Sequence, residues 1–283
     1  MAKHQHKPKH KKQPNHRRIT TNPTAAAGAN VLFKAAHSSS DPLLRKIFWG
    51  LVLCCAIFTI GLAVNSGING DDSFQNDYSD QLIDWYLTMG QDTSAFYHPK
   101  GPIQYYGGMY EIPTGAINRT LGLDASDEVY HQIRHFFNAI FGIVAMIFVG
   151  LLARHIGGWQ AGIIGLLLIV LSPRFLGHSL MNPKDIPFAA GYIMAIYFLA
   201  RLMTQLPRPN IKTLLGLAVG IGIAFGTRAG GLILLPYVAL FVGLTFVGQY
   251  GWAAIFKQAR TAGRYAAYGI LPIIIGLSIG LLF

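Results

Sequence analysis

Long apolar runs separated by short polar segments dominate this chain. A helix that crosses a hydrocarbon core of about 30 Å needs about 20 predominantly apolar residues. The runs predict about seven transmembrane helices, at residues 46–64, 135–153, 159–171, 186–203, 213–225, 232–247 and 266–283. The third and fifth runs are short, so we expect them to be tilted or to be covered by other protein at their ends. The pattern predicts an all-α, polytopic membrane protein.

The segment between the first two runs, residues 65–130, is polar but not featureless. In "YSDQLIDWYLTM" (78–89) the apolar residues recur near helical spacing, and "YYGGMYEIPTGAINRTLG" (105–122) shows the same pattern less cleanly. We expect two short amphipathic helices that lie along the membrane surface. Turns are expected around them at Gly90, Gly101, Gly107 and Gly108.

The composition agrees with a membrane protein, because 52% of the residues are apolar and only 12% are charged, whereas soluble domains carry about 25% charged residues. The net charge of +11 is concentrated in residues 1–18, which hold seven Lys and Arg, four His and no acid. We predict that residues 1–44 form a disordered basic cytoplasmic tail that touches anionic lipid, with metal binding by its histidines as the alternative. The remaining charges nearly balance, so no nucleic-acid partner is expected.

Lys and Arg in the short connections predict the orientation. With the tail inside, the connections that contain Arg154, Arg201 to Lys212, and Lys257 to Arg264 also fall on the cytoplasmic side, as the positive-inside rule requires. Residues 65–130 then form an external loop with ten acidic and two basic residues, a net charge of −8. Residues 45–283 are expected to form one transmembrane module. Since the chain stops on an apolar run, we expect a truncated C-terminus.

Four basic residues fall on the external side, against the positive-inside rule: Arg134, Arg174, Lys184 and Arg228. Pairing with loop carboxylates is one explanation. A second is a site for a phosphate or pyrophosphate headgroup, which guanidinium and ammonium groups suit. His131 lies close to Arg134 at the start of the second run and is a candidate supporting residue of such a site.

The stretch "SPRFLGHSLMNPKD" (172–185) precedes the fourth run and holds two of these cations. Prolines at 173, 183 and 187 predict a shaped loop that opens the helix, because proline lacks an amide donor and restricts its predecessor. Asp185 is expected in the first helical turn, where either a capping or a binding role is open. His178 is either a hydrogen-bonded loop residue or a catalytic one.

Asp71 and Asp72 follow the first run directly, in "NSGINGDDSF". Adjacent acids raise each other's proton affinity and burial raises it further, which would suit a general base. Two alternatives remain open: a solvated pair that begins the next helix, or a site for Mg²⁺ or Mn²⁺. No cofactor is certain, and a divalent metal stays open.

Four segments, "GDDSFQNDYSDQLIDWY", "YYGGMYEIP", "HQIRHFFNAIFG" and "SPRFLGHSLMNPKDIPFAAGY", together resemble bacterial members of the GT-C superfamily, in the protein O-mannosyltransferase and aminoarabinose-transferase group. The resemblance spans about residues 45–250. It implies an integral-membrane glycosyltransferase of the inner (cytoplasmic) membrane. Such an enzyme takes a sugar from a polyprenyl-phosphate donor on the outer face and places it on an acceptor lipid, glycan or protein.

The resemblance also implies roles for particular residues. Asp71 and Asp72 match the two positions of the catalytic acidic pair, although glutamate is more usual at the second. Arg174, Lys184 and Asp185 match the segment that lines the carrier-phosphate cavity, and Arg228 matches through the shorter "GTRAGG". Such enzymes usually continue for several more spans and often end in an external domain, so the acceptor stays undetermined.

Two other classes of protein fit part of the pattern. A transporter or flippase of lipid-linked sugars would place charges near the midplane within pseudo-symmetric halves, whereas here the charges gather at one face. A non-catalytic scaffold explains the acidic loop but not the external cations. An enzyme requires Asp71, Arg174 and Lys184 to face one external cavity.

Overall fold

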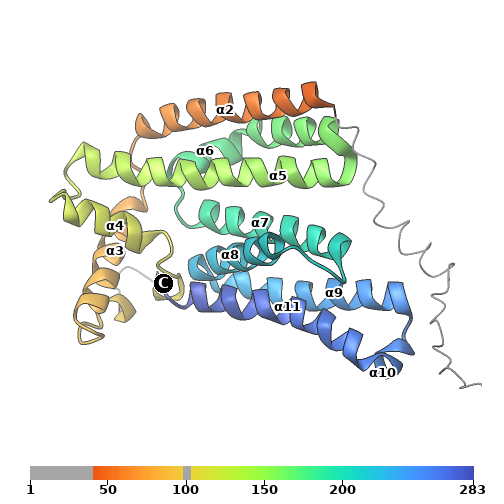
Figure 1. Ribbon diagram of the computed structural model, residues 1–283. Coiled ribbons are helices and arrows are strands. Elements are labelled where there is room, and N and C mark those ends of the chain that lie inside the picture. Colours follow the sequence, from red (N-terminus) through yellow and green to blue (C-terminus); the bar gives the residue numbers. More distant parts are fainter. Residues whose placement is uncertain (1–40, 98–102) are drawn as a thin grey trace, which may run out of the picture.

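Every named element in the described part of the chain, residues 41–97 and 103–283, is a helix in this computed structural model (Figure 1). The described residues form no strand, and their β pairing is limited to an isolated bridge between Tyr106 and Arg228. The all-α prediction is therefore confirmed for these residues. Residues 1–40 of the predicted tail and the turn expected at Gly101 lie outside the described ranges.

Five of the described helical segments are long and apolar enough to cross a bilayer: α2 (Pro42–Val64), α5 (Glu128–Val170), α7 (Asp185–Gln205), η3 (Ala229–Ile233) continued by α9 (Leu234–Tyr250), and α11 (Ala259–Gly280). Of the other predicted runs, one is α8 (Ile211–Thr227), which is apolar but shorter. The run at 159–171 belongs mostly to α5. The count of about seven transmembrane helices is thus not confirmed.

The helix α5 contains two antiparallel arms, because the chain reverses at Gly157 and Gly158 (Figure 1). Gly158 has a φ of 78°, in the left-handed region that favours glycine. Past the reversal the arms pack closely, and a Cβ on Gly162 would lie 3.0 Å from the Cβ of Arg154. The break predicted between residues 153 and 159 is therefore a sharp turn between two apolar arms.

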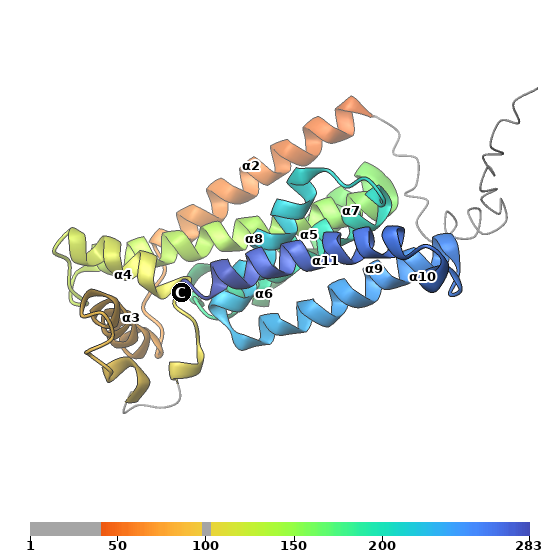
Figure 2. The same ribbon diagram turned by 60° about the horizontal axis from the view of Figure 1, so that its bottom comes forward.

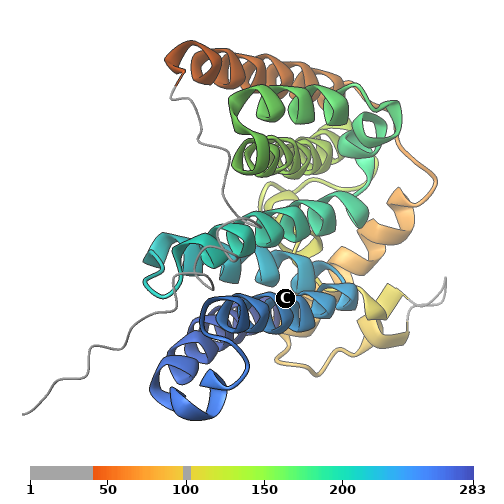
Figure 3. The ribbon, with the colours of Figure 1, turned by 90° about the vertical axis from the view of Figure 1, so that its right-hand side faces the viewer.

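Two apolar clusters hold the bundle together. The first joins α2 to both arms of α5 and the second joins α7, α8, α9 and α11; Figure 3 shows these groups as an upper and a lower layer. Small residues allow α7 and α8 to pack backbone against backbone, since a Cβ on Gly191 would lie 2.5 Å from the amide nitrogen of Ala224. Fully buried large side chains include Phe48, Met146 and Leu166 in the first cluster and Leu202, Leu217, Ile221 and Val238 in the second.

The segment after α2 forms α3 (Asp72–Leu87) and α4 (Glu111–Thr120), with the short turns η1 (Ser94–Tyr97) and η2 (Ile103–Tyr105) between them. The two expected helices are thus confirmed. Both lie at one end of the bundle, close to the C-terminal Phe283, whereas α10 (Ala254–Lys257) lies at the opposite end (Figures 1 and 2). Their position along a membrane surface stays a prediction.

The prediction of a loop at residues 172–184 is wrong, because most of this segment forms the helix α6 (Pro173–Met181). Ser172 caps this helix by accepting a hydrogen bond from the amide of Phe175, and Pro173 occupies the first turn, where its missing N–H costs nothing. The chain leaves the helical conformation at Asn182, and α7 then begins with Asp185 in its first turn, as expected.

Candidate active site

A pocket of about 640 Å³ opens where α3, α6 and α7 meet at this end of the bundle. Its wall includes six of the residues that the sequence singled out: Asp71, Arg174, His178, Lys184, Asp185 and Arg228. These six come from the N-terminus of α3, from α6, from the start of α7 and from the end of α8. The other three predicted site residues, Asp72, His131 and Arg134, do not line the pocket.

Asp71 and Lys184 face each other across the pocket. Asp71 is the residue before α3, and 71% of its side chain is exposed. Its carboxylate oxygen lies 3.5 Å from Nζ of Lys184. The ammonium group also lies 5.3 Å from the ring centre of Phe74 and 5.4 Å from that of Tyr106, which are cation–π distances. The two rings therefore help the Asp71 carboxylate to fix the position of the Lys184 ammonium group.

Arg228 forms an ion pair with Asp185 on the neighbouring wall. The guanidinium carbon lies 5.0 Å from the centre of the Tyr106 ring, and Nη2 lies 3.4 Å from the phenolic oxygen. Tyr106 thus contacts the cation of each ion pair in the pocket, Lys184 and Arg228.

Backbone hydrogen bonds fix the segment that carries Tyr106 to the end of α8. The amide of Gly107 donates to the carbonyl of Thr227 at 3.1 Å, and the amide of Met109 donates to that of Gly226 at 3.0 Å. A Cβ on Gly107 would lie 2.1 Å from the Gly226 carbonyl oxygen, so only glycine permits this approach. Gly107, which was expected to mark a turn, therefore allows two backbone segments to approach each other closely.

Asn182 connects α6 to α7. Its amide nitrogen is hydrogen-bonded to Nδ1 of His178 at 2.6 Å and to the carboxylate of Asp185 at 3.0 Å. Its amide oxygen accepts the backbone N–H of Lys184 at 3.2 Å and that of Asp185 at 3.0 Å. One side chain thus orients three residues of the pocket wall.

Asp72 is buried behind the pocket and differs sharply from Asp71. It accepts the backbone N–H and the side-chain amide of Asn69, both at 2.8 Å, and lies 3.8 Å from Nε2 of His135. Burial by itself would raise the pKa of Asp72, but His135 and the Asn69 hydrogen bonds lower it below its usual range. The prediction that Asp72 has a raised proton affinity is therefore wrong.

Asn69 also fixes the position of Asp71. Its amide oxygen accepts the backbone N–H of Asp71 at 2.7 Å, while its amide nitrogen donates to the carbonyl of Met181 at 2.8 Å. The loop before α3 is thereby attached to the end of α6. The two aspartates consequently have different partners, one at the pocket surface and one beneath it.

Arg134 and His131 contribute to the support of the external segment. Arg134 forms a buried ion pair with Glu111 of α4 and donates to Thr114 at 3.2 Å. Nε2 of His131 lies 3.0 Å from the carbonyl oxygen of Ala125. For Arg134 the simpler explanation, pairing with a carboxylate of the loop, describes what the structure shows.

Comparison with protein families decides the class of protein. The family model described as dolichyl-phosphate-mannose-protein mannosyltransferase matches residues 128–275, which is just over half of the chain. The chain belongs to this family. It is therefore a multi-pass membrane glycosyltransferase of the GT-C kind. Searches of curated proteins and of solved structures gave no significant match.

The family match includes Arg174, Lys184 and Arg228, whereas Asp71 and Asp72 lie before it. It does not separate the protein O-mannosyltransferases from the aminoarabinose transferases, and it does not favour a transporter or flippase. The donor class and the acceptor of this mannosyltransferase-family protein are therefore matters for proposal.

The structure adds pocket residues that the sequence analysis did not single out: Asn69, Gln75, Tyr106 and Asn182. Gln75 is 2% exposed, and its side-chain oxygen lacks a hydrogen-bond partner among the described residues. These four residues are uncharged, so the count of Lys and Arg on each side of the membrane, which identified the cations, could not detect them. Asn182 does precede Pro183, and an Asn–Pro pair is a recognised turn signal that could have drawn attention to it.

The described residues contain no group of three or more His, Cys, Asp or Glu side chains suited to hold a metal ion. Asp71 and Asp72 are adjacent, but the carboxylate of Asp72 is bonded to Asn69 and that of Asp71 faces Lys184. The pair therefore does not present two free carboxylates to one point, as a shared divalent cation would require.

Proposed function

We propose that this pocket transfers a sugar from a polyprenyl-phosphate donor to an acceptor on the outer face of the inner membrane. The observation that carries the proposal is the convergence of one exposed carboxylate, Asp71, with Arg174, Lys184 and Arg228 around a single pocket. Family membership supports glycosyl transfer as the reaction. The three cations of the pocket support a donor whose sugar is linked to a phosphate.

The pocket suits an anion. Its ionisable lining comprises three cations and two carboxylates, apart from His178, so it carries a net charge of +1. Arg174 is exposed and has no hydrogen-bond or ion-pair partner among the described residues, so its guanidinium is free for a ligand. A phosphate that approached Lys184 and Arg228 would compete with Asp71 and Asp185 for them. Donor binding would then release the Asp71 carboxylate toward the acceptor.

The chemistry needs both kinds of group. The acceptor hydroxyl oxygen forms a bond to the anomeric carbon while the bond from that carbon to the phosphate oxygen breaks, and its electron pair stays on the phosphate. The hydroxyl proton passes to the Asp71 carboxylate. Arg174, Lys184 and Arg228 meet the negative charge that grows on the leaving phosphate. Asp72 holds the loop in place, and Gln75 offers an amide to a sugar hydroxyl.

The site end of the bundle would face outward if the N-terminus is cytoplasmic. The first span, α2, then delivers Asp71 to the outer face, and the connections that hold Arg201 to Lys212 and Lys257 to Arg264 remain on the inner face. This orientation supports an acceptor on the outer side.

Transfer by purified protein in lipid vesicles tests the proposal. Radiolabelled mannosyl polyprenyl phosphate is the first donor and an aminoarabinosyl polyprenyl phosphate the second, with total membranes of the source organism as acceptor. We expect Asp71→Asn to lower turnover about 10²- to 10³-fold, the usual effect of removing one well-placed catalytic group. Glu128→Gln is the matched control, because Glu128 is exposed at the same end and, among the described residues, its side chain accepts a hydrogen bond from Gln132 alone.

Normal turnover in Asp71→Asn would contradict its role as the base. Movement of intact donor across the vesicle membrane, without loss of its sugar, would instead support the transporter alternative. If the wild type transfers neither sugar although it binds polyprenyl phosphate, the choice of sugar class is wrong.

A further inference from the structure

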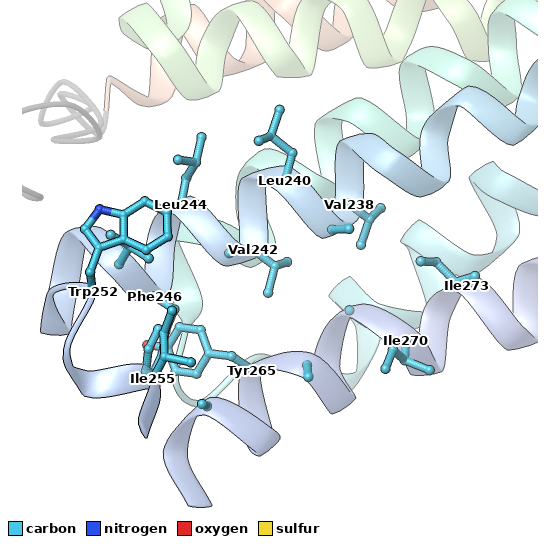
Figure 4. A pocket seen from close by; sticks show the side chains of 16 residues that line it. Val238, Leu240, Val242, Leu244, Phe246, Trp252, Ile255, Tyr265, Ile270 and Ile273 are labelled. Atoms are coloured by element: carbon cyan, nitrogen blue, oxygen red, sulfur yellow. The ribbon is translucent and has the colours of Figure 1, made fainter. Parts of the chain in front are cut away.

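The active-site pocket differs in its chemistry from a second pocket, of about 510 Å³, that lies between α9 and α11 (Figure 4). Apolar side chains such as Leu240, Val242 and Ile270 line the second pocket, and none of its lining residues is charged. The active-site pocket instead contains polar side chains, and the hydrogen bonds that they already form decide what they can offer a ligand. His178 is one of these side chains, and among the described residues only one of its two ring nitrogens is hydrogen-bonded.

Asn182 determines which nitrogen of the His178 ring carries the proton. The amide oxygen of Asn182 accepts the backbone N–H groups of Lys184 and Asp185. Its amide nitrogen therefore faces Nδ1 of His178, at 2.6 Å, and also donates to the Asp185 carboxylate at 3.0 Å. An amide nitrogen is a donor only, so Nδ1 must accept, and the proton of the neutral ring lies on Nε2.

This arrangement leaves His178 without a free base. The electron pair of the neutral ring is on Nδ1, where Asn182 already donates to it. Nε2 carries the proton and has no hydrogen-bond partner in the part of the chain that the structure describes. His178 therefore offers the pocket an N–H donor and no acceptor, which assigns the proton of the acceptor hydroxyl to another group.

His178 lies one helical turn after Arg174, on the face of α6 that lines the pocket. Gly177 lies on the same face, and a Cβ added there would meet nothing within 4 Å, so a ligand can approach the helix closely. The free Arg174 guanidinium and the His178 N–H are both donors. Oxygens of an ionised phosphate only accept hydrogen bonds, whereas a sugar hydroxyl also donates. This face of α6 therefore suits a phosphate.

We propose that Nε2–H of His178 donates a hydrogen bond to a phosphate oxygen of the lipid carrier, beside the Arg174 guanidinium. Asn182 is then a positioning residue, because it sets the tautomer of His178. The inference rests on the proposed function, since it takes a phosphate as the ligand of this pocket. A neutral N–H adds a directed hydrogen bond without adding a further positive charge to those of Arg174, Lys184 and Arg228.

Two opposite substitutions of His178 test the proposal through the Kd of the full chain for a short-chain polyprenyl phosphate. In His178→Asn the amide oxygen takes the place of Nδ1 and still accepts from Asn182, but the N–H at the Nε2 position is lost. We expect Kd to rise about tenfold or more while Tm stays unchanged. In His178→Gln the amide nitrogen takes the place of Nε2, so Kd should stay close to that of the wild type while Tm falls. His155→Asn, the same change at the opposite end of the bundle, is the matched control and should bind normally.

Nuclear magnetic resonance of protein labelled with nitrogen-15 histidine reports the tautomer without any ligand. The difference between the spectra of the wild type and His178→Gln isolates the His178 ring. We expect a protonated Nε2 and an unprotonated Nδ1. Asn182→Asp places a carboxylate oxygen opposite Nδ1 and should move a proton onto that nitrogen, because a carboxylate oxygen only accepts.

Four results would overturn the proposal. An unchanged Kd in His178→Asn, together with a raised Kd in Arg174→Gln, would remove His178 from a phosphate site that otherwise stands. A Kd that rises in His178→Gln but not in His178→Asn would show that His178 only supports the fold. A proton on Nδ1 in the wild type would contradict the tautomer. If the wild type does not bind polyprenyl phosphate, the proposed donor is wrong as well.

Discussion

Asp71 and Asp72 are neighbours in sequence, but their surroundings predict that they affect different properties of the protein. Asp72→Asn preserves the shape of the side chain. One of its two terminal atoms then becomes a donor, however, and it can no longer accept both hydrogen bonds from Asn69. The substitution also removes the negative charge that lies 3.8 Å from Nε2 of His135. Among the described residues, Asp71→Asn weakens only the exposed side-chain contact with Lys184.

The hydrogen bonds set the magnitude. A hydrogen bond to a charged group contributes about 1.5–3 kcal/mol, so we expect Asp72→Asn to cost about 2 kcal/mol. In a protein of this size 1 kcal/mol shifts Tm by about 2–4 °C, which gives a fall of about 4–8 °C. An exposed ion pair contributes at most about 1 kcal/mol, so Asp71→Asn should lower Tm by at most about half as much.

The effect of pH has a defined sign. Because the fold lowers the pKa of Asp72, its ionised form contributes stability at every pH above the unfolded value of about 3.9. That contribution is lost as the pH falls through the lower folded pKa. The Tm difference between wild type and Asp72→Asn should therefore be constant from neutral pH to about pH 5 and shrink below about pH 4.

Thermal unfolding of the wild type and both variants in detergent, followed by intrinsic fluorescence from pH 7 down to about pH 3, checks the prediction. An unchanged Tm for Asp72→Asn would refute the structural role of the buried carboxylate. So would a difference from wild type that widens on acidification.

Two further substitutions test how the external segment is held. Gly107→Ala should lower transfer by up to about 100-fold and lower Tm, because its Cβ would meet the Gly226 carbonyl at 2.1 Å and displace Tyr106; Gly67→Ala, whose Cβ meets nothing within 4 Å, is the control. Glu111→Gln should cost about 3–5 kcal/mol in unfolding experiments, because it leaves the buried Arg134 without a counter-charge. Asp84→Asn, at the exposed pair with Arg119, should cost under about 1 kcal/mol.

Hydropathy and charge predicted the parts of this protein that depend on the bilayer. The apolar runs correspond to helices because a backbone in hydrocarbon must satisfy its own hydrogen bonds. The excess of cations at 174, 184 and 228 stood out against the positive-inside rule, and the structure brings these side chains to one pocket. The division of α5 at Gly157 and Gly158 was also visible as an interruption of the apolar pattern.

Local chemistry was harder to predict. The three prolines suggested a loop at 172–184, yet Ser172 and Pro173 together are a helix start signal, and the helix continues to Met181. Arg134 was grouped with the phosphate-binding cations because its partner, Glu111, is distant in sequence and was not distinguished from the other loop acids. Tyr106 and Asn69 act through contacts that only the folded chain brings together.

The affinity of the protein for a short-chain polyprenyl phosphate, without sugar, tests the central claim most directly. Arg174 is the one predicted phosphate-binding residue with a free side chain in the described part of the pocket, so Arg174→Gln perturbs no internal contact. A charge-assisted hydrogen bond of about 1.5–3 kcal/mol predicts a Kd at least about tenfold higher in this variant. Arg119→Gln, which removes an exposed cation paired with Asp84, should bind normally. An unchanged Kd for Arg174→Gln, or an equal loss in Arg119→Gln, would contradict the account.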